Sequence, residues 1–299
     1  MSVKVDSKSI AQEILDNHDT FLFDCDGVLW LGTSLLPKVV ETINLLRSLN
    51  KQVIFVTNNS TKSRAEYTQK FLKFGLKVDK TEIFGSAFAA AIYVSKIVNL
   101  PKDKKVWVLG QNGIEEELRE LGYTTIGGTD KELDQPFSTD LKFIKETDKD
   151  VACVVVGLDL NINYYRMAAT LKYLQNPDIP FIATNIDSTF PQKGLVLPGA
   201  GSIIESVAFG SGRTPISSGK PEKGMMDAIR SSFKIDDDRT IMIGDRLNTD
   251  MVFGRTNNLD TLLVLTGIET EANIAKLDKN VQPTYFANKL GDLFELTSI

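Results

Sequence analysis

The chain has 299 residues, of which 42% are hydrophobic and 24% charged, a globular composition with more length than one domain usually fills. The net charge is −5 and no long basic run occurs, so we expect no nucleic-acid partner. No apolar leader and no apolar stretch of about 18 residues occurs, which predicts a cytoplasmic protein without a membrane partner. The single histidine excludes metal sites built from several histidines, and neither Cys25 nor Cys153 is followed by the arginine that a cysteine phosphatase needs.

Four short apolar segments, each running into polar residues, indicate buried strands. They are residues 21–23, 53–56, 240–243 and 261–265. Segments that are apolar at every position fit parallel strands covered on both faces, and helical spacing follows them along the chain. The polar residues come at the carboxyl ends of these segments, where open α/β sheets place their active sites. We therefore predict an α/β fold whose core is a Rossmann-like, doubly wound parallel sheet.

A second α/β pattern lies between the second and third of these segments. We expect strands at residues 105–110, 151–156 and 181–184, and helices at residues 113–121 and 164–174. The polar stretch 127–150 is expected to be a long, irregular surface loop. These elements predict a large inserted α/β cap domain at residues 96–213 and a discontinuous core domain made of residues 1–95 and 214–299.

Two aspartates, Asp24 and Asp26, follow the first predicted strand. If the extended geometry continued past the strand, both side chains would lie on one face, and such a pair of carboxylates is costly unless a cation compensates it. Asp245 and Asp250 follow another predicted strand, and with Asp24 they would form the all-oxygen ligand set that Mg²⁺ prefers. The alternatives are an Asp-Gly turn at Asp26 and helix capping by one of the later aspartates.

Candidate phosphate-binding residues follow the second predicted strand. Thr57, Asn58 and Asn59 offer a hydroxyl group and backbone N–H groups at the edge of the sheet where the aspartates are expected. The alternative role of this stretch is to cap the next helix. Lys220, in the sequence SGKP, offers a positive charge, although an isolated loop lysine is more commonly a solvated surface residue.

In chain order, DCDGV, Thr57, Lys220 and GDRLNTD resemble the four signature motifs of the haloacid dehalogenase superfamily. The longer stretches are similar to the 4-nitrophenylphosphatase and phosphoglycolate phosphatase branch, most closely to its fungal member. These stretches are FLFDCDGVLW, VIFVTNNSTKSR, TNIDSTFPQKG, PGAGSIIES, SGKP and MIGDRLNTDM. The resemblance covers nearly the whole chain, and members of this branch carry a large α/β cap between the second and third motifs.

The resemblance implies a role for each candidate residue. Asp24 is similar to the family nucleophile, Asp26 to the general acid and base, and Lys220 to the residue that orients the nucleophile and offsets charge. The implied substrate-binding residues are Thr57, Asn58, Asn59 and Lys220. The implied magnesium ligands are Asp24, Asp245, the backbone carbonyl of Asp26 and, through the waters of the metal, Asp250.

The resemblance further implies a Mg²⁺-dependent phosphatase that carries the phosphoryl group on Asp24 and hydrolyses a small phosphorylated metabolite. A 2-phosphoglycolate-like acid is the expected substrate, 4-nitrophenyl phosphate an artificial one, and metabolite repair the expected role. Residues 185–191 of the cap are expected to contact the substrate, and the resemblance also allows a homodimer formed through the cap. The alternatives are a pyridoxal phosphate phosphatase, a protein phosphatase or nucleotidase, a phosphoryl-transferring mutase, and a non-enzymatic regulator with this fold.

Overall fold

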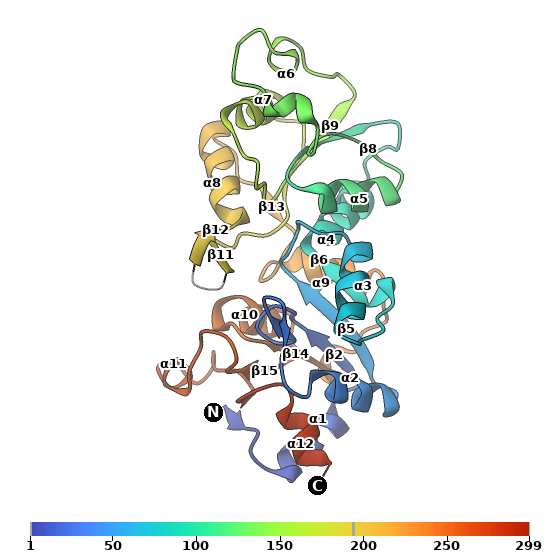
Figure 1. Ribbon diagram of the computed structural model, residues 1–299, viewed down its shortest axis with the longest axis vertical. Coiled ribbons are helices and arrows are strands. Elements are labelled where there is room, and N and C mark those ends of the chain that lie inside the picture. The colour runs from blue at the N-terminus through green and yellow to red at the C-terminus, as the bar shows by residue number, and fades with distance from the viewer. Residues whose placement is uncertain (1, 193–194, 299) are drawn as a thin grey trace. The chain divides into compact units, whose positions relative to one another are not determined.

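The computed structural model describes residues 2–192 and 195–298, and Figure 1 shows their helices and strands. Residues 193 and 194, the end of the TNIDSTFPQKG stretch, lie outside the described residues. The chain forms two compact units. The first unit comprises Met1–Thr57, Thr68–Phe84 and Ile229–Ile299, and the second unit comprises Asn58–Tyr67 and Gly85–Ala228.

The first unit is built on one large sheet. Its strands are β1 (Val3–Lys4), β2 (Thr20–Phe23), β5 (Gln52–Thr57), β6 (Ile83–Gly85), β14 (Thr240–Gly244), β15 (Asp260–Val264) and β16 (Tyr285–Ala287). A short separate pair is formed by β3 (Trp30–Leu31) and β4 (Ser34–Leu35). The helices are α1 (Lys8–Asn17), α2 (Val39–Ser48), α10 (Val252–Thr256), α11 (Glu271–Ala275) and α12 (Asp292–Thr297). Helices α3 (Arg64–Lys73) and α9 (Lys223–Arg230) contribute residues to both units.

The large sheet has seven strands in the order β1-β16-β15-β14-β2-β5-β6. The pairings from β1 to β5 are all parallel. Every residue of β2 and β14 is buried. Since neighbouring side chains of a strand point to opposite faces, such strands require cover on both sides of the sheet. The Rossmann-like parallel core predicted from the apolar segments is therefore confirmed.

The second unit has its own α/β organisation. Its strands are β7 (Lys105–Leu109), β8 (Thr124–Gly127), β9 (Val151–Val156), β10 (Phe181–Ala183), β13 (Ile216–Ser217) and the antiparallel pair β11 (Thr189–Gln192) and β12 (Leu195–Pro198). Its helices are α4 (Ser86–Ile92), α5 (Asn112–Glu120), α6 (Lys142–Lys145), α7 (Tyr164–Leu174) and α8 (Ala200–Ser211). Five strands form a parallel sheet in the order β13-β10-β9-β7-β8.

Helices cover both faces of this five-stranded sheet (Figure 1). Val106 and Val108 of β7 pack in one apolar cluster with residues of α4 and α5. The alternate residues, Trp107 and Leu109, pack in another cluster with residues of α7 and α8. This alternation is what a strand buried on both faces requires, and the predicted inserted α/β unit is confirmed.

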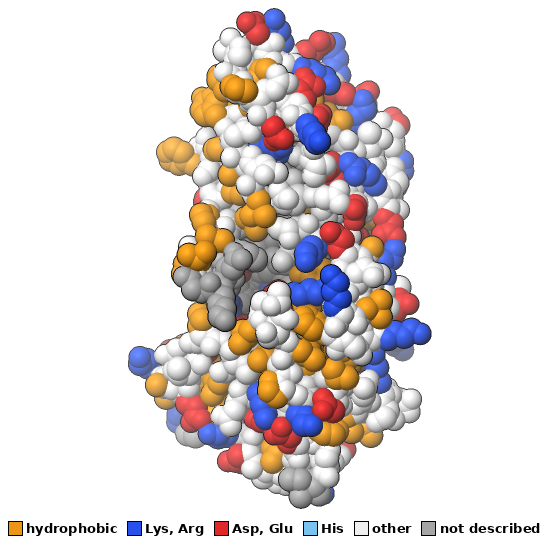
Figure 2. Space-filling model, viewed as in Figure 1, with side chains coloured by type: hydrophobic (Ala, Val, Ile, Leu, Met, Phe, Trp, Pro, Cys, Tyr) orange, Lys and Arg blue, Asp and Glu red, His pale blue; other side chains and the backbone are white. Residues whose placement is uncertain are grey.

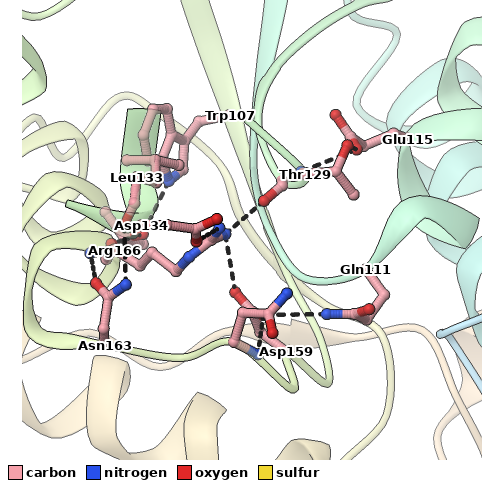
Figure 3. A network of polar contacts seen from close by, with 12 residues as sticks. Trp107, Gln111, Glu115, Thr129, Leu133, Asp134, Asp159, Asn163 and Arg166 are labelled. Carbon is pink, nitrogen blue, oxygen red and sulfur yellow. Dashed lines mark hydrogen bonds and ion pairs between the residues drawn. The ribbon is translucent and has the colours of Figure 1, made fainter. Parts of the chain in front are cut away.

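A polar network around the buried Arg166 and Asp159 lies at the carboxyl ends of the strands of the second unit (Figure 3). Nη1 of Arg166, on α7, lies 3.3 Å from Oδ2 of Asp159 and also donates to the carbonyl of Gly128. Nη2 of Arg166 donates to Oδ1 of Asp134 at 2.8 Å, and Gln111 donates to Oδ1 of Asp159 at 3.2 Å. Arg166 and Asp159 are both 2% exposed, so this is a buried ion pair that ties α7 to the loops after β7, β8 and β9.

The structure corrects the expectation for residues 127–150. This stretch was predicted to be an irregular surface loop, but it contains a helical turn at Lys131–Asp134 and the helix α6. Leu133 and Phe143, one on each of these elements, are buried in the same cluster as Trp107. Isolated apolar side chains in a polar stretch carry no periodic signal, and only their packing partners reveal their burial.

The compact units differ in their limits from the predicted domains. Residues 58–67, 85–95 and 214–228 belong to the second unit, although the sequence analysis assigned them to the core. The reason is visible in the packing, because α4 covers one face of the five-stranded sheet and β13 extends this sheet beside β10. A functional division into core and cap at residues 96 and 213 stays a prediction.

The surface carries a mixture of side-chain types. Basic and acidic side chains are interspersed over the face shown in Figure 2. Val196 on β12 and Phe209 on α8 are large apolar side chains that are largely exposed. No helix among the described residues is both long and apolar enough to cross a bilayer. A homodimer formed through the second unit stays a prediction.

Candidate active site

Three aspartates meet at the carboxyl end of the large sheet of the first unit. Asp24 follows β2 and Asp245 follows β14, and these are neighbouring parallel strands in which Phe23 pairs with Ile243. Asp250 lies on the helical turn that follows β14. One carboxylate oxygen of each aspartate lies within 4.8 Å of those of the other two, and all three residues are buried. Negative charges at this separation repel one another unless a cation or bound protons compensate them.

Glycines bring the backbone against these carboxylates. A Cβ atom on Gly27 would lie 2.3 Å from Oδ2 of Asp245, and one on Gly267 would lie 2.0 Å from the same oxygen. A Cβ atom on Gly244 would lie 2.1 Å from the Cβ of Asp250. The loops therefore close around the cluster without room for any other side chain at these positions. A compact set of three carboxylates fits Mg²⁺, which takes hard oxygen ligands.

The carboxylate of Asp26 is directed elsewhere. Its Oδ1 accepts a hydrogen bond of 2.7 Å from Trp30 Nε1 and lies 3.6 Å from Lys70 Nζ. β2 ends at Phe23, before both aspartates, so the strand itself does not fix the side chains of Asp24 and Asp26 on one face. Among the described residues, the carboxylate cluster therefore consists of the other three aspartates. A metal contact through the backbone carbonyl of Asp26 stays a prediction.

The stretch after β5 does not cap the next helix. Asn59 Oδ1 accepts hydrogen bonds from the N–H and the hydroxyl of Thr61, a local turn that asparagine commonly forms. Helix α3 is capped by Ser63 and Glu66. The Ser63 hydroxyl accepts a hydrogen bond from the N–H of Glu66, and the Glu66 carboxylate accepts one from the N–H of Ser63. The alternative role of residues 57–60 as the helix cap is thus wrong.

Asn58 and Lys220 meet in the second unit. Asn58 Oδ1 accepts a hydrogen bond of 2.8 Å from the N–H of Lys220, and Asn58 Nδ2 donates one of 2.8 Å to the carbonyl of Lys220. Lys220 is only 2% exposed, so the alternative of a solvated loop lysine is wrong. A buried lysine needs polar or negatively charged surroundings, and a role of Lys220 in an anion site stays a prediction.

The predicted site residues therefore fall into two groups. The first unit contains Asp24, Asp26, Thr57, Asp245 and Asp250, and the second contains Asn58, Asn59 and Lys220. Thr57 is the buried last residue of β5, which pairs with β2. Trp30 and Lys70 were missed by the sequence analysis, because no spacing rule links them to Asp26.

Comparison with known proteins identifies the family. The model of the haloacid dehalogenase-like hydrolases matches residues 21–124, and a second model of hydrolases of the same kind matches residues 217–293. The chain is 44% identical to a 4-nitrophenylphosphatase of Schizosaccharomyces pombe over 99% of both chains. It is 43% identical to phosphoglycolate phosphatase 2 of Arabidopsis thaliana, again over 99% of both chains.

A solved structure extends the comparison to the fold. The crystal structure of a 4-nitrophenylphosphatase from Thermotoga maritima matches with a TM-score of 0.80 and 27% identity, over 95% of this chain and 99% of the other. The similarity covers nearly the whole chain and therefore residues of both units. The chain therefore belongs to the haloacid dehalogenase-like hydrolases, in their 4-nitrophenylphosphatase and phosphoglycolate phosphatase branch, and is a phosphoric monoester hydrolase of that type.

Proposed function

We propose that this phosphatase hydrolyses small phosphorylated acids of the 2-phosphoglycolate type through an aspartyl-phosphate on Asp24, with Mg²⁺ as its cofactor. The observation that carries this proposal is the buried cluster of Asp24, Asp245 and Asp250 at the carboxyl end of the sheet. When bound by these carboxylates, Mg²⁺ would neutralise charge on the phosphate and on the attacking carboxylate. A metabolite-repair role, the removal of a phosphorylated by-product, is part of the same proposal.

The reaction then has two displacements at phosphorus. Asp24 attacks the phosphorus with a carboxylate oxygen and the bond from phosphorus to the ester oxygen breaks, while protonated Asp26 donates its proton to the leaving alkoxide. Asp26 then takes a proton from a water molecule, whose oxygen attacks the phosphorus of the acyl-phosphate. Inorganic phosphate leaves and the Asp24 carboxylate is restored.

The remaining candidates would hold the phosphoryl group. The hydroxyl of Thr57 and the backbone N–H of Asn58 would donate to its oxygens, with Asn59 in the same turn. Lys220 would orient Asp24 and offset the charge of the phosphoryl oxygens. If Lys220 and the metal hold the phosphoryl group, which all substrates share, selectivity among substrates has to come from contacts to their carbon part. Residues 185–191 are the proposed source of these contacts.

Other functions of the same branch stay open as alternatives. A pyridoxal phosphate phosphatase or a protein phosphatase would use the same chemistry on another substrate, and a mutase would transfer the phosphoryl group onward. A non-enzymatic regulator is a different class, and the intact Asp24 and Asp26 argue against it. The name of one relative that matches over 99% of both chains, a phosphoglycolate phosphatase, supports the small-acid phosphatase.

A substrate panel tests the proposal. Phosphate release is measured from 2-phosphoglycolate, pyridoxal phosphate, 4-nitrophenyl phosphate and a phosphopeptide, with Mg²⁺ and with EDTA. The proposal predicts Mg²⁺-dependent release with the highest kcat/KM on 2-phosphoglycolate or a similar acid. A preference for pyridoxal phosphate or for the phosphopeptide would replace the proposed substrate. No release from any compound would favour the regulator.

A further inference from the structure

The side-chain amide of Asn58 has all its hydrogen-bonding groups in use. Its Oδ1 accepts from the N–H of Lys220, and its Nδ2 donates to the carbonyl of Lys220 and to Oδ2 of Asp187, each at 2.8 Å. An asparagine amide has two N–H donors and one oxygen, so these bonds fix its rotation. Asn58 thus holds the backbone of Lys220 on both sides while Asp187 holds Asn58.

Asp187 is itself held in place by further polar contacts. Oδ2 of Asp187 also accepts a hydrogen bond of 2.8 Å from Asn185 Nδ2. Oδ1 of Asn185 in turn accepts from the hydroxyls of Ser86 and Thr184, each at 3.0 Å. Asn185, Ser86 and Thr184 are buried, and polar groups away from water are costly unless they are paired. The hydrogen bonds of Ser86, Thr184 and Asn185 therefore restrict the orientation of the Asp187 carboxylate.

The backbone of Asp187 is fixed as well. Its carbonyl accepts a hydrogen bond of 2.9 Å from the N–H of Gly201, at the start of α8. The carbonyl of the next residue, Ser188, accepts from the N–H of Gly199 at 2.9 Å. These two bonds close the base of the β11–β12 hairpin. These backbone bonds thus fix the position from which the Asp187 carboxylate contacts Asn58, and a side chain that orients a site residue has to be held in this way.

The loop that carries Lys220 packs against the same residues. A Cβ atom on Gly219 would lie 2.6 Å from the carbonyl oxygen of Thr184, 2.7 Å from the Cβ of Asn185 and 2.9 Å from Oδ1 of Asn58. Only glycine fits there without moving one of these neighbours. The loop of Lys220 is therefore placed by two segments that are distant in sequence, at Asn58 and at residues 184–185, and its backbone is bonded to the Asn58 amide on both its N–H and its carbonyl.

We propose that Asp187 is a positioning residue that sets the place of Lys220 by orienting the Asn58 amide. The inference rests on the proposed function, since it gives Lys220 the role of the charged group of the phosphate site. Both donors end on one oxygen of Asp187, so an amide oxygen at the same position can accept the same two bonds. A methyl group cannot, and the side-chain N–H groups of Asn58 and of the buried Asn185 would then lose their acceptor.

The experiment compares Asp187→Asn with Asp187→Ala, and uses the exposed Asp178→Ala of the same unit as a matched control. Circular dichroism first shows that each variant is folded. We expect Asp187→Ala to lower kcat about 10- to 100-fold, since a displacement of about 1 Å can cost about 100-fold. Asp187→Asn should lose clearly less kcat than Asp187→Ala, because it keeps an acceptor oxygen for both donors, and Asp178→Ala should equal wild type.

A double variant decides whether Asp187 acts through Asn58. If it does, Asn58→Ala combined with Asp187→Ala loses no more activity than the more severe single change, because the intermediate amide is already gone. Losses that multiply would overturn the proposal. So would equal losses for Asp187→Asn and Asp187→Ala, or full activity in both.

A readout without catalysis separates this inference from the proposed function. Hydrogen exchange of the Lys220 amide, which donates to Asn58, should become at least about 10-fold faster in Asp187→Ala and stay unchanged in Asp187→Asn. If wild type shows no Mg²⁺-dependent turnover but this exchange pattern holds, the proposed function fails and the positioning network stands. Unchanged exchange in Asp187→Ala overturns the positioning role itself.

Discussion

Trp30 holds the carboxylate of Asp26 by a hydrogen bond of 2.7 Å from its indole Nε1 to Oδ1. The Trp30 ring is itself fixed between Phe71 and Phe74, at centroid distances of 5.1 and 5.4 Å. Lys70 Nζ lies 3.9 Å from the centre of the same ring and 3.6 Å from Oδ1 of Asp26. In the proposed mechanism Asp26 is the general acid, and a general acid works only when its carboxyl group is held at the leaving oxygen, so the contacts of Trp30 would bear on that mechanism.

We expect Trp30→Phe to affect substrates according to their leaving groups. The change keeps most of the ring packing but removes the N–H donor. A loss of about 10- to 100-fold is expected for alkyl phosphates such as 2-phosphoglycolate, whose alkoxide needs a proton. The loss for 4-nitrophenyl phosphate should be only a few-fold, because its leaving phenolate is already stable.

The matched control is Trp107→Phe, which removes an indole donor to Thr170 in the second unit. It should change both substrates equally. Equal losses on the two substrates in Trp30→Phe would contradict a role of Trp30 in orienting the general acid, and would indicate a general effect on packing instead.

Mg²⁺ should stabilise the protein as well as activate it. The cation offsets the repulsion among the three buried aspartates, and binding to the folded state alone adds about 2.7 kcal/mol when Mg²⁺ is present at about 100 times its Kd. We therefore expect a higher melting temperature with Mg²⁺ than with EDTA, and a smaller rise in Asp250→Asn. The exposed Asp103→Asn serves as the control. A rise of the same size in Asp250→Asn would contradict a contribution of that carboxylate.

Removing one partner of the buried Arg166–Asp159 pair should destabilise the fold more than removing both. Burial is the main cause that raises the pKa of Asp159, and the positive charge of Arg166 acts to lower this pKa. Removing one partner leaves the other buried without its counter-charge, so Arg166→Leu should lower the free energy of unfolding by about 3–5 kcal/mol. Adding Asp159→Leu should recover part of this loss in urea denaturation. A double variant that is even less stable than Arg166→Leu would contradict this account.

Cys153 should be unreactive in the native protein. Burial raises the pKa of its thiol to about 12, so at pH 8 only about 1 in 10,000 molecules carries the reactive thiolate. We expect iodoacetamide at pH 8 to leave Cys153 unmodified in the native protein and to alkylate it fully in urea. Peptide mapping measures the extent of modification. Because the pKa is raised, reactivity should increase only as the pH approaches that value. Rapid native labelling at pH 8 would show that the thiol is accessible.

The strands that carry the site could be predicted because burial on both faces leaves a continuous apolar segment in the sequence. The segments before Asp24 and Asp245 are of this kind, and their parallel pairing brings the two aspartates together. Two-residue strands such as β1 and β13 were not predicted, since so short a pairing carries no periodicity. The hairpin β11–β12 was also missed, because its described residues are mostly exposed.

The contacts that support the site residues could not be predicted. Asn58 lies 129 residues from Asp187 and 162 residues from Lys220, so no local pattern joins them. The side chain of Asp26 was expected beside Asp24, but the end of β2 and the donor of Trp30 decide its direction. Residue types and motif order therefore point to the chemistry, whereas the orientation of each group depends on tertiary packing.

The most direct test of the account is the activity of Asp24→Asn. The substitution keeps the size of the side chain but replaces the nucleophilic carboxylate by an amide. With 2-phosphoglycolate or 4-nitrophenyl phosphate and saturating Mg²⁺, we predict at least a 1,000-fold loss of phosphate release, on the order of losses seen when a covalent nucleophile is removed. The variant should keep the circular dichroism spectrum of wild type. Activity close to that of wild type would contradict the aspartyl-phosphate mechanism.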